Sequence, residues 1–165
     1  MIILGVDPGT AITGYGLVRE EDDQLLLADC GVITTAAGQA LPVRLQVIYQ
    51  RLTELARRHR PDAAAVEELF FSRNARTALA VGHARGVALL ALADAGLPVF
   101  EYTPMDVKRA VAGYGGADKS QVGEMVRLLL DLDRVPQPDD AADALAIAIC
   151  HIHSARMAEL LAGSE

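Results

Sequence analysis

The stretch from Gln137 to Ile149, QPDDAADALAIAI, constrains the fold of this chain more than any other. Its proline and aspartates suit the first turn of a helix, where proline loses no hydrogen bond and carboxylates meet the positive end of the helix dipole. The alanines, leucine and isoleucines behind them predict an apolar helix held against a core. Asp143 follows Asp140 by three residues, so both carboxylates leave one face of that helix. The alternative is that these acids only cap the helix and Asp143 is solvated.

The rest of the chain predicts strands and helices in a distinctive order. Three strands come first, at Ile2–Asp7, Ile12–Arg19 and Gln24–Thr35, with Glu20–Asp23 as the turn before the third. Helices then alternate with strands: a helix from Pro42, the strand Ala63–Glu68, a helix at about Asn74–Asp94, and the strand Val99–Tyr102. Two more helices are predicted, one from Pro104 with Thr103 as N-cap and one at Asp118–Asp131. The order predicts one α/β domain over residues 1–165, with a mixed five-stranded sheet (three antiparallel strands, then parallel ones) flanked by helices.

The net charge and composition of the chain exclude few functional classes. The net charge of −7 argues mildly against a nucleic-acid binder, but the objection weakens if several acids gather in one site. Cys30 and Cys150 lack metal-ligand spacing and fit free thiols in a reducing cytoplasm. The opening MIILGV has no basic region of a signal peptide, and no apolar run reaches the roughly 20 residues that span a bilayer. We therefore expect a soluble, cytoplasmic protein with no membrane partner.

Two further carboxylates come at the ends of predicted strands. A right-handed crossover should make the first and fourth strands parallel neighbours, which places Asp7 and Glu67 at one carboxyl edge, where open α/β sheets bind ligands. Strand alternation lets only one of Glu67 and Glu68 point with Asp7, and the pattern favours Glu67 without excluding Glu68. The structural alternatives are that Asp7-Pro8-Gly9 is simply good turn chemistry and that one glutamate is merely exposed.

Four carboxylates converging in one place repel one another unless cations neutralise them. An all-oxygen donor set suits Mg²⁺ or Mn²⁺, not zinc. Two divalent ions about 4 Å apart would balance four acids and form the clamp that phosphodiester hydrolysis needs. One ion would activate a water for in-line attack, and the other would take up charge on the leaving oxygen.

Lys108 and Lys119 are the only lysines in the chain. Lys119 follows the flexible approach Gly115–Asp118, where a point charge can meet a phosphate; an ordinary surface lysine is the alternative. A stripe of arginines at Arg44, Arg51 and Arg58 is interpreted as a solvated helix face.

Aromatic and basic residues mix around the loop that precedes the long helix. Phe70 and Phe71 are flanked by arginines that include Arg76 and Arg85, a pattern suited to stacking on unpaired bases, although an apolar lid over the sheet is the alternative. On the long helix, Gly82 and Gly86 lie one turn apart at a cost in helix propensity. They indicate close packing either on the sheet or on a second subunit.

Several motifs cover nearly the whole chain in one order: ILGVDPGT and TGYG, VEELFFSRNARTAL and ARGVAL, VFEY and VKRAVAGYG, then DKSQV and DDAADALAIAI. In these motifs the chain resembles bacterial Holliday-junction resolvases of the RuvC family. The resemblance implies a ribonuclease-H-like fold. It also implies a catalytic, metal-binding tetrad at Asp7, Glu67, Asp140 and Asp143. It thus favours Glu67 over Glu68 and Asp140 over Asp139.

The same resemblance implies that Lys108 and Lys119 contact the substrate and that Phe70 stacks on a base, with Arg76 as a further candidate contact. The implied activity is a Mg²⁺- or Mn²⁺-dependent endodeoxyribonuclease with two ions per site. It would resolve four-way junctions in recombination and repair by paired symmetric nicks that leave 5′-phosphate and 3′-hydroxyl ends. A homodimer and the RuvA–RuvB branch-migration complex are the implied partners.

Two other functional classes fit parts of this pattern. Asp7-Pro8-Gly9-Thr10 also resembles the first phosphate loop of the sugar-kinase and actin ATPases, but those proteins need a second such domain, for which the chain lacks the length. A junction-binding protein without catalysis would not need four acids.

Overall fold

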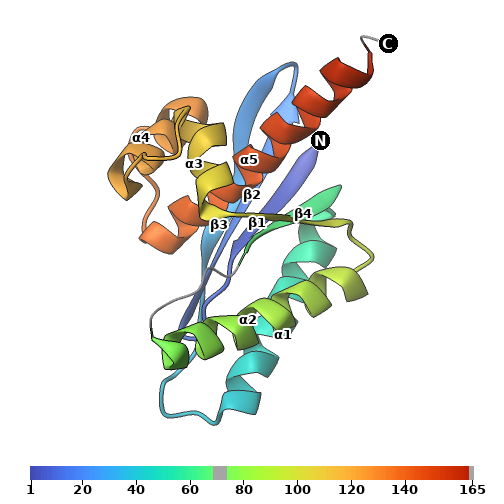
Figure 1. The fold of residues 1–165 in the computed structure, drawn as a ribbon. Coiled ribbons are helices and arrows are strands. Elements are labelled where there is room, and N and C mark those ends of the chain that lie inside the picture. The colour runs from blue at the N-terminus through green and yellow to red at the C-terminus, as the bar shows by residue number, and fades with distance from the viewer. Residues whose placement is uncertain (69–73, 164–165) are drawn as a thin grey trace.

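The computed structural model describes residues 1–68 and 74–163. Its elements, in chain order, are β1 (Ile2–Asp7), β2 (Ile12–Glu21), β3 (Gln24–Thr34), α1 (Leu41–His59), β4 (Ala63–Glu67), α2 (Ala75–Asp94), β5 (Val99–Tyr102), α3 (Pro104–Ala112), α4 (Lys119–Leu129) and α5 (Asp139–Ala162) (Figure 1). The strands form one five-stranded sheet in the order β3-β2-β1-β4-β5. Neighbours are antiparallel from β3 to β1 and parallel from β1 to β5, which confirms the predicted mixed sheet.

The predicted turn at Glu20–Asp23 is too long. β2 continues through Glu21, which pairs with Gln24, so only Asp22 and Asp23 form the connection. Both have positive φ angles, 50° and 64°. A two-residue hairpin loop needs this conformation to match the strand twist, and aspartate tolerates it better than most residues.

Three residues predicted inside helices instead precede them. Asn74 and Asp118 are N-caps, and their side chains accept hydrogen bonds from the first-turn N–H groups of α2 and α4. Such capping leaves the residue itself outside the helix. Pro138 likewise lies just before α5, which begins at Asp139. The predicted cap at Thr103 is confirmed: its side chain accepts from the Asp106 N–H, and its own N–H donates to the Asp106 carboxylate.

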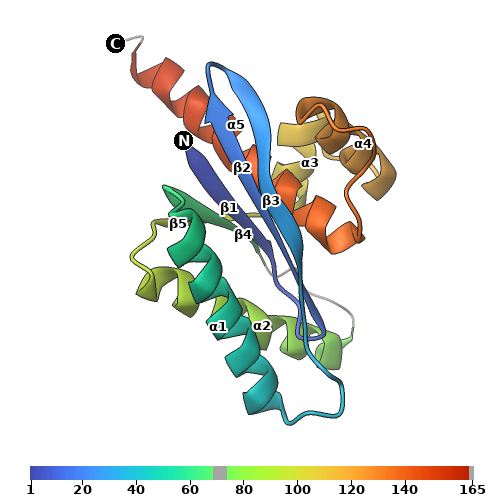
Figure 2. The ribbon, with the colours of Figure 1, turned by 180° about the vertical axis from the view of Figure 1, so that it is seen from behind.

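Helices cover both faces of the sheet (Figures 1 and 2). On one face α5 packs on residues such as Ile3 and Ala65, and α3 and α4 pack against α5. On the other face α1 and α2 pack on residues such as Leu4 and Val66. Because side chains alternate along a strand, the odd-numbered residues of β1 and β4 face α5.

Two helices, α2 and α5, are long and apolar enough to cross a membrane by length and composition, which corrects the expectation that no such run exists. Residues 141–152 of α5 are buried except for Asp143, because the sheet lies on one side and α3 and α4 lie on the other. α5 is therefore a core helix. α2 is much less buried and leaves Leu79 and Leu90 on its outer face 62% and 54% exposed.

Candidate active site

Asp7 and Glu67 end neighbouring parallel strands. In the β1–β4 ladder Val6 is the partner of Val66, so the next residues of the two strands, Asp7 and Glu67, follow side by side. Strand alternation directs both side chains to the α5 face. Glu68 is exposed, and its N–H donates to the backbone oxygen of Tyr102 at 2.8 Å. The geometry thus favours Glu67 over Glu68 as the neighbour of Asp7.

Glycines bring the start of α5 down onto the sheet. A Cβ on Gly14 would lie 2.0 Å from the backbone oxygen of Asp140, and a Cβ on Gly5 would lie 2.0 Å from that of Ala144. No side chain fits at such distances, so glycine is what permits this depth of packing. Gly14 is also the β2 partner of Asp7. The contact therefore places Asp140 beside the end of β1.

The four predicted acids, Asp7, Glu67, Asp140 and Asp143, interact as one four-acid cluster. Burial and then the negative charges of the other three raise the pKa of Asp7 to about 8. Burial and the charge of Asp143 raise the pKa of Glu67, and burial raises that of Asp143. Converging carboxylates produce such shifts, which are common at functional sites.

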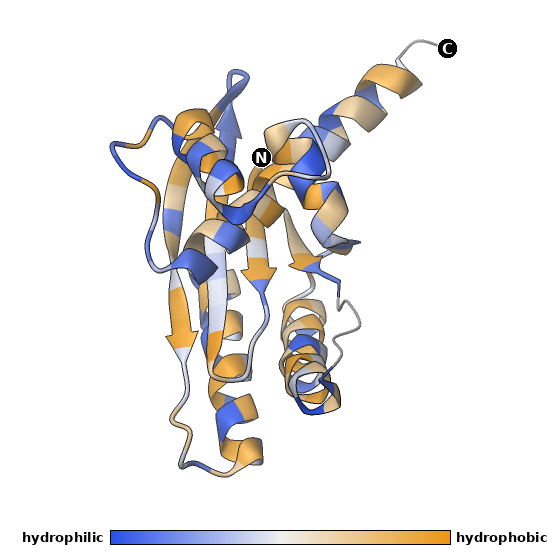
Figure 3. Cartoon of the chain, turned by 60° about the vertical axis from the view of Figure 1, so that its left-hand side comes forward, coloured by the Kyte–Doolittle hydropathy of each residue, from blue (hydrophilic) through white to orange (hydrophobic). Residues whose placement is uncertain are grey.

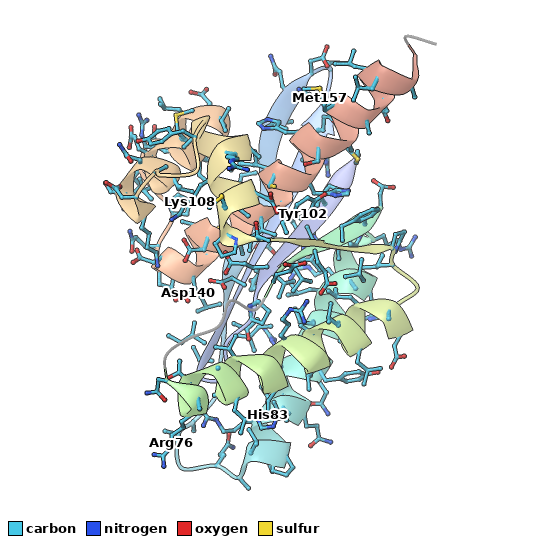
Figure 4. The ribbon with its side chains drawn as sticks, in the orientation of Figure 1. Arg76, His83, Tyr102, Lys108, Asp140 and Met157 are labelled. Carbon is cyan, nitrogen blue, oxygen red and sulfur yellow. The ribbon has the colours of Figure 1, made fainter. Side chains whose placement is uncertain are left out.

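Two lysines oppose this negative charge. Lys119 begins α4, and its Nζ lies 3.1 Å from Oδ2 of Asp143 and 3.8 Å from Oδ2 of Asp139. The hydrogen bond to Asp143 raises the pKa of Lys119. Lys108, labelled on α3 in Figure 4, lines a cavity of about 270 Å³ together with Glu67, Lys119 and Asp143. Both lysines therefore face a cavity that reaches the four-acid cluster.

The donor set of the cluster fits a hard divalent cation, because Mg²⁺ and Mn²⁺ prefer carboxylate oxygens. Within residues 1–68 and 74–163, no three Asp, Glu, His or Cys side chains stand close enough to enclose an ion as placed. Asp143 instead bonds to Lys119. Burial and mutual repulsion raise the pKa values of Asp7 and Glu67, and a bound cation would offset this repulsion.

Among the described residues, one predicted site residue, Arg76, is not gathered with the cluster. Arg76 lies in the first turn of α2, and Figure 4 shows it well separated from Asp140. Phe70 lies outside the described residues, so its stacking role stays a prediction. Asp139, with a side chain 63% exposed, contacts Lys119 from the first position of α5.

Sequence reasoning missed the contact that Arg85 makes with the cluster. The Arg85 Nε donates to the backbone oxygen of Glu67 at 3.3 Å, and its guanidinium pairs with the carboxylate of Glu101. The sequence placed Arg85 only among the arginines around the aromatic loop. A bond from a helix side chain to a strand carbonyl has no sequence signature.

Comparison with known proteins identifies the family. The sequence model for crossover junction endodeoxyribonuclease RuvC matches residues 3–151. This chain belongs to the RuvC family. The RuvC of Pelotomaculum thermopropionicum is 59% identical over 153 residues, 93% of each chain. The RuvC of Chloroflexus aurantiacus is 61% identical over 155 residues, 94% of each.

Solved RuvC structures agree with the fold of this RuvC-family chain. Thermus thermophilus RuvC superposes with a TM-score of 0.90 at 42% identity, covering 96% of this chain and 97% of that one. T. thermophilus RuvC in complex with a Holliday junction substrate gives a TM-score of 0.91 at 42% identity, covering 96% of both chains. The ribonuclease-H-like fold implied by the sequence motifs is confirmed.

Proposed function

We propose that this RuvC-family chain is a metal-dependent endodeoxyribonuclease that resolves four-way DNA junctions by paired symmetric nicks, in homologous recombination and repair. The observation that carries the proposal is the convergence of the four-acid cluster from β1, β4 and α5 beside a cavity lined by Lys108 and Lys119. The complex of T. thermophilus RuvC with a Holliday junction supports the choice of substrate. The products would carry 5′-phosphate and 3′-hydroxyl ends.

The four-acid cluster would hold two Mg²⁺ or Mn²⁺ ions. Such ions supply an activated water and stabilise charge on the phosphate and the leaving oxygen. The protein's own task is to fix the carboxylate oxygens. Asp7 and Glu67 are fixed by paired strand ends, and Asp140 is fixed by the contact of α5 with Gly14. Rigid elements hold such oxygens more accurately than loops do.

The lysines would bind the phosphodiester backbone. Because Lys108 and Lys119 line one cavity with Glu67, a phosphate that enters it meets two ammonium groups next to the cluster. These contacts would supply affinity without sequence information. Phe70 would stack on a base unpaired at the crossover. Arg76, in the first turn of α2, would contact a more distant part of the junction backbone.

A homodimer fits the two-fold symmetry of a four-way junction, and α2 supplies an apolar face for it. Leu79 and Leu90 are exposed there, and a Cβ on Gly86 would meet nothing within 4 Å. Gly86 is therefore not packed on the sheet, which supports the second of the two sequence interpretations, a second subunit. The neighbouring α1 adds exposed Leu41 and Val43, and both helices show apolar turns in Figure 3. An isologous contact through these helices would pair two active sites.

The RuvA–RuvB branch-migration complex is the partner we propose on the strength of family membership. Its role would be to bring junctions to the dimer in the cytoplasm.

The proposal is tested by incubating the protein with a labelled four-way junction and a matched linear duplex, each with Mg²⁺, with Mn²⁺ and with chelator. We expect paired nicks in the junction alone, and only with metal. Junction binding without cutting in either metal would favour a non-catalytic junction-binding protein instead.

A further inference from the structure

Arg85 joins three elements directly behind the four-acid cluster. From α2, its Nε donates to the backbone oxygen of Glu67 at the end of β4. The same guanidinium pairs with Glu101 of β5, and the Arg85 side chain is only 22% exposed. Val66 and Glu101 are partners in the β4–β5 ladder. One planar group therefore clamps the ends of two neighbouring strands.

Arg85 contacts the main chain of Glu67 and not its carboxylate. Glu67 is the ladder partner of Tyr102, and both side chains face α5, whereas Glu101 faces the α2 side of the sheet. Arg85 thus leaves the Glu67 carboxylate free for the four-acid cluster while holding the backbone that carries it. Its fork of donors can bond a carbonyl and a carboxylate together, which a lysine ammonium does less well.

A second bond ties α2 to the other catalytic strand. Thr10, in the turn after β1, is nearly buried, and its Oγ1 donates to the backbone oxygen of Ala80 at 2.6 Å. α2 therefore makes two contacts, one with Thr10, three residues after Asp7, and one with the backbone of Glu67. α2 braces the two strand ends from the face opposite α5.

We propose that Arg85 is a positioning residue for the nuclease reaction. By holding the Glu67 main chain against β5 and α2, Arg85 fixes the separation of Glu67 from Asp7 and hence the spacing of the oxygens that receive metal. The inference rests on the proposed metal-binding role of the four-acid cluster. Groups that orient metal ligands from behind typically contribute about 10- to 100-fold to metal affinity or activity.

The test compares wild type, Arg85→Ala, Arg85→Lys and Glu101→Gln. Arg51→Ala is the matched control, because Arg51 also pairs with a glutamate (Glu54, 3.4 Å) but on the exposed surface of α1. Three quantities are measured: turnover at saturating four-way junction across a Mg²⁺ series, junction affinity in chelator, and Mg²⁺ or Mn²⁺ binding by calorimetry without DNA.

For Arg85→Ala we expect turnover to fall by about 10-fold or more. The metal midpoint, which is the Mg²⁺ or Mn²⁺ concentration at half-saturation, should rise by about 10-fold or more. Junction affinity should stay within about twofold of wild type. Arg85→Lys should recover part of the turnover and part of the metal affinity. Glu101→Gln should lower both quantities by a smaller factor than Arg85→Ala does. Arg51→Ala should match wild type. Glu101→Gln also keeps the inference testable if Arg85→Ala does not fold.

An unchanged metal midpoint in both Arg85→Ala and Glu101→Gln would overturn the inference, as would a turnover loss that disappears at a temperature where the variant is fully folded. If the wild type cuts no junction in either metal, the proposed function fails instead. The calorimetric comparison still tests Arg85 in that case, because it needs no DNA.

Discussion

Gly14 lies directly beneath Asp140: a Cβ on Gly14 would sit 2.0 Å from the Asp140 backbone oxygen. Gly14 is also the β2 partner of Asp7. One close contact therefore sets the separation of two acids that come from opposite ends of the chain. The cluster depends on the absence of a side chain as much as on the presence of carboxylates.

We expect Gly14→Ala to impair both folding and cleavage. The clash is with helix backbone, which cannot rotate away, so the start of α5 must lift from the sheet. Such overpacking typically costs about 1–3 kcal/mol, and displacing Asp140 by about 1 Å should lower the cleavage rate by about 100-fold. Thermal unfolding and junction cleavage measure the two effects. Gly38→Ala is the control, since nothing lies within 4 Å of a Cβ there. Wild-type cleavage by Gly14→Ala would contradict the role of this contact.

The raised pKa of Asp7 predicts that the metal-free protein loses stability as pH rises. With a pKa of about 8 when folded against an ordinary value of 3.8, the folded state binds the proton more tightly between these limits. The stability linked to this group is full below pH 3.8 and is lost as pH rises through about 8. One proton gives a slope of at most about 1.4 kcal/mol per pH unit.

Asp7→Asn should remove this slope. The free energy of unfolding of the variant should match that of wild type near pH 4 and exceed it at pH 8, as measured by denaturant unfolding in chelator. Mg²⁺ at pH 8 should stabilise wild type more than the variant. Glu68→Gln, a change at the exposed neighbour of Glu67, is the control. If the unfolding free energies of wild type and Asp7→Asn change with pH in parallel, Asp7 is not buried among like charges.

Much of the site could be predicted from sequence because strand alternation, N-cap preference and the right-handed crossover of parallel strands are general rules. The parallel pairing of β1 and β4, the gathering of Asp7 with Glu67, and the N-cap at Thr103 all followed from such rules and are confirmed. The bond of Lys119 to Asp143 and that of Arg85 to the Glu67 carbonyl were not predicted. Both depend on how α4 and α2 dock, which no local pattern specifies.

The apolar face of α2 predicts that Leu90→Lys weakens the proposed dimer. Introducing a charge at the centre of an apolar contact should shift sedimentation toward monomer at concentrations where wild type is dimeric. Leu128→Lys on α4 is a matched control, since Leu90 and Leu128 are 54% and 55% exposed. A dimer equally resistant to both changes would place the interface elsewhere. A wild type that is monomeric both free and on a junction would refute the dimer itself.

Phe70→Ala should impair cleavage more than binding. If the ring stacks on a base unpaired near the crossover, its removal costs about 1–3 kcal/mol. A junction with unpaired bases beside the scissile phosphate should restore much of the rate, because the substrate no longer requires unstacking. The same junction should not rescue Asp7→Asn, whose defect lies in the four-acid cluster. Equal rescue of both variants, or of neither, would refute this division of roles.

Single-turnover cleavage of a labelled four-way junction by Asp7→Asn, with junction affinity measured on the same samples, tests the role of the four-acid cluster most directly. The lysines, not the acids, should supply phosphate affinity, so the variant should bind the junction at least as tightly as wild type. Cleavage in Mg²⁺ or Mn²⁺ should fall by several orders of magnitude, because the cluster loses a charged oxygen donor that a metal ion needs. Cleavage at the wild-type rate would contradict a catalytic centre at the ends of β1 and β4.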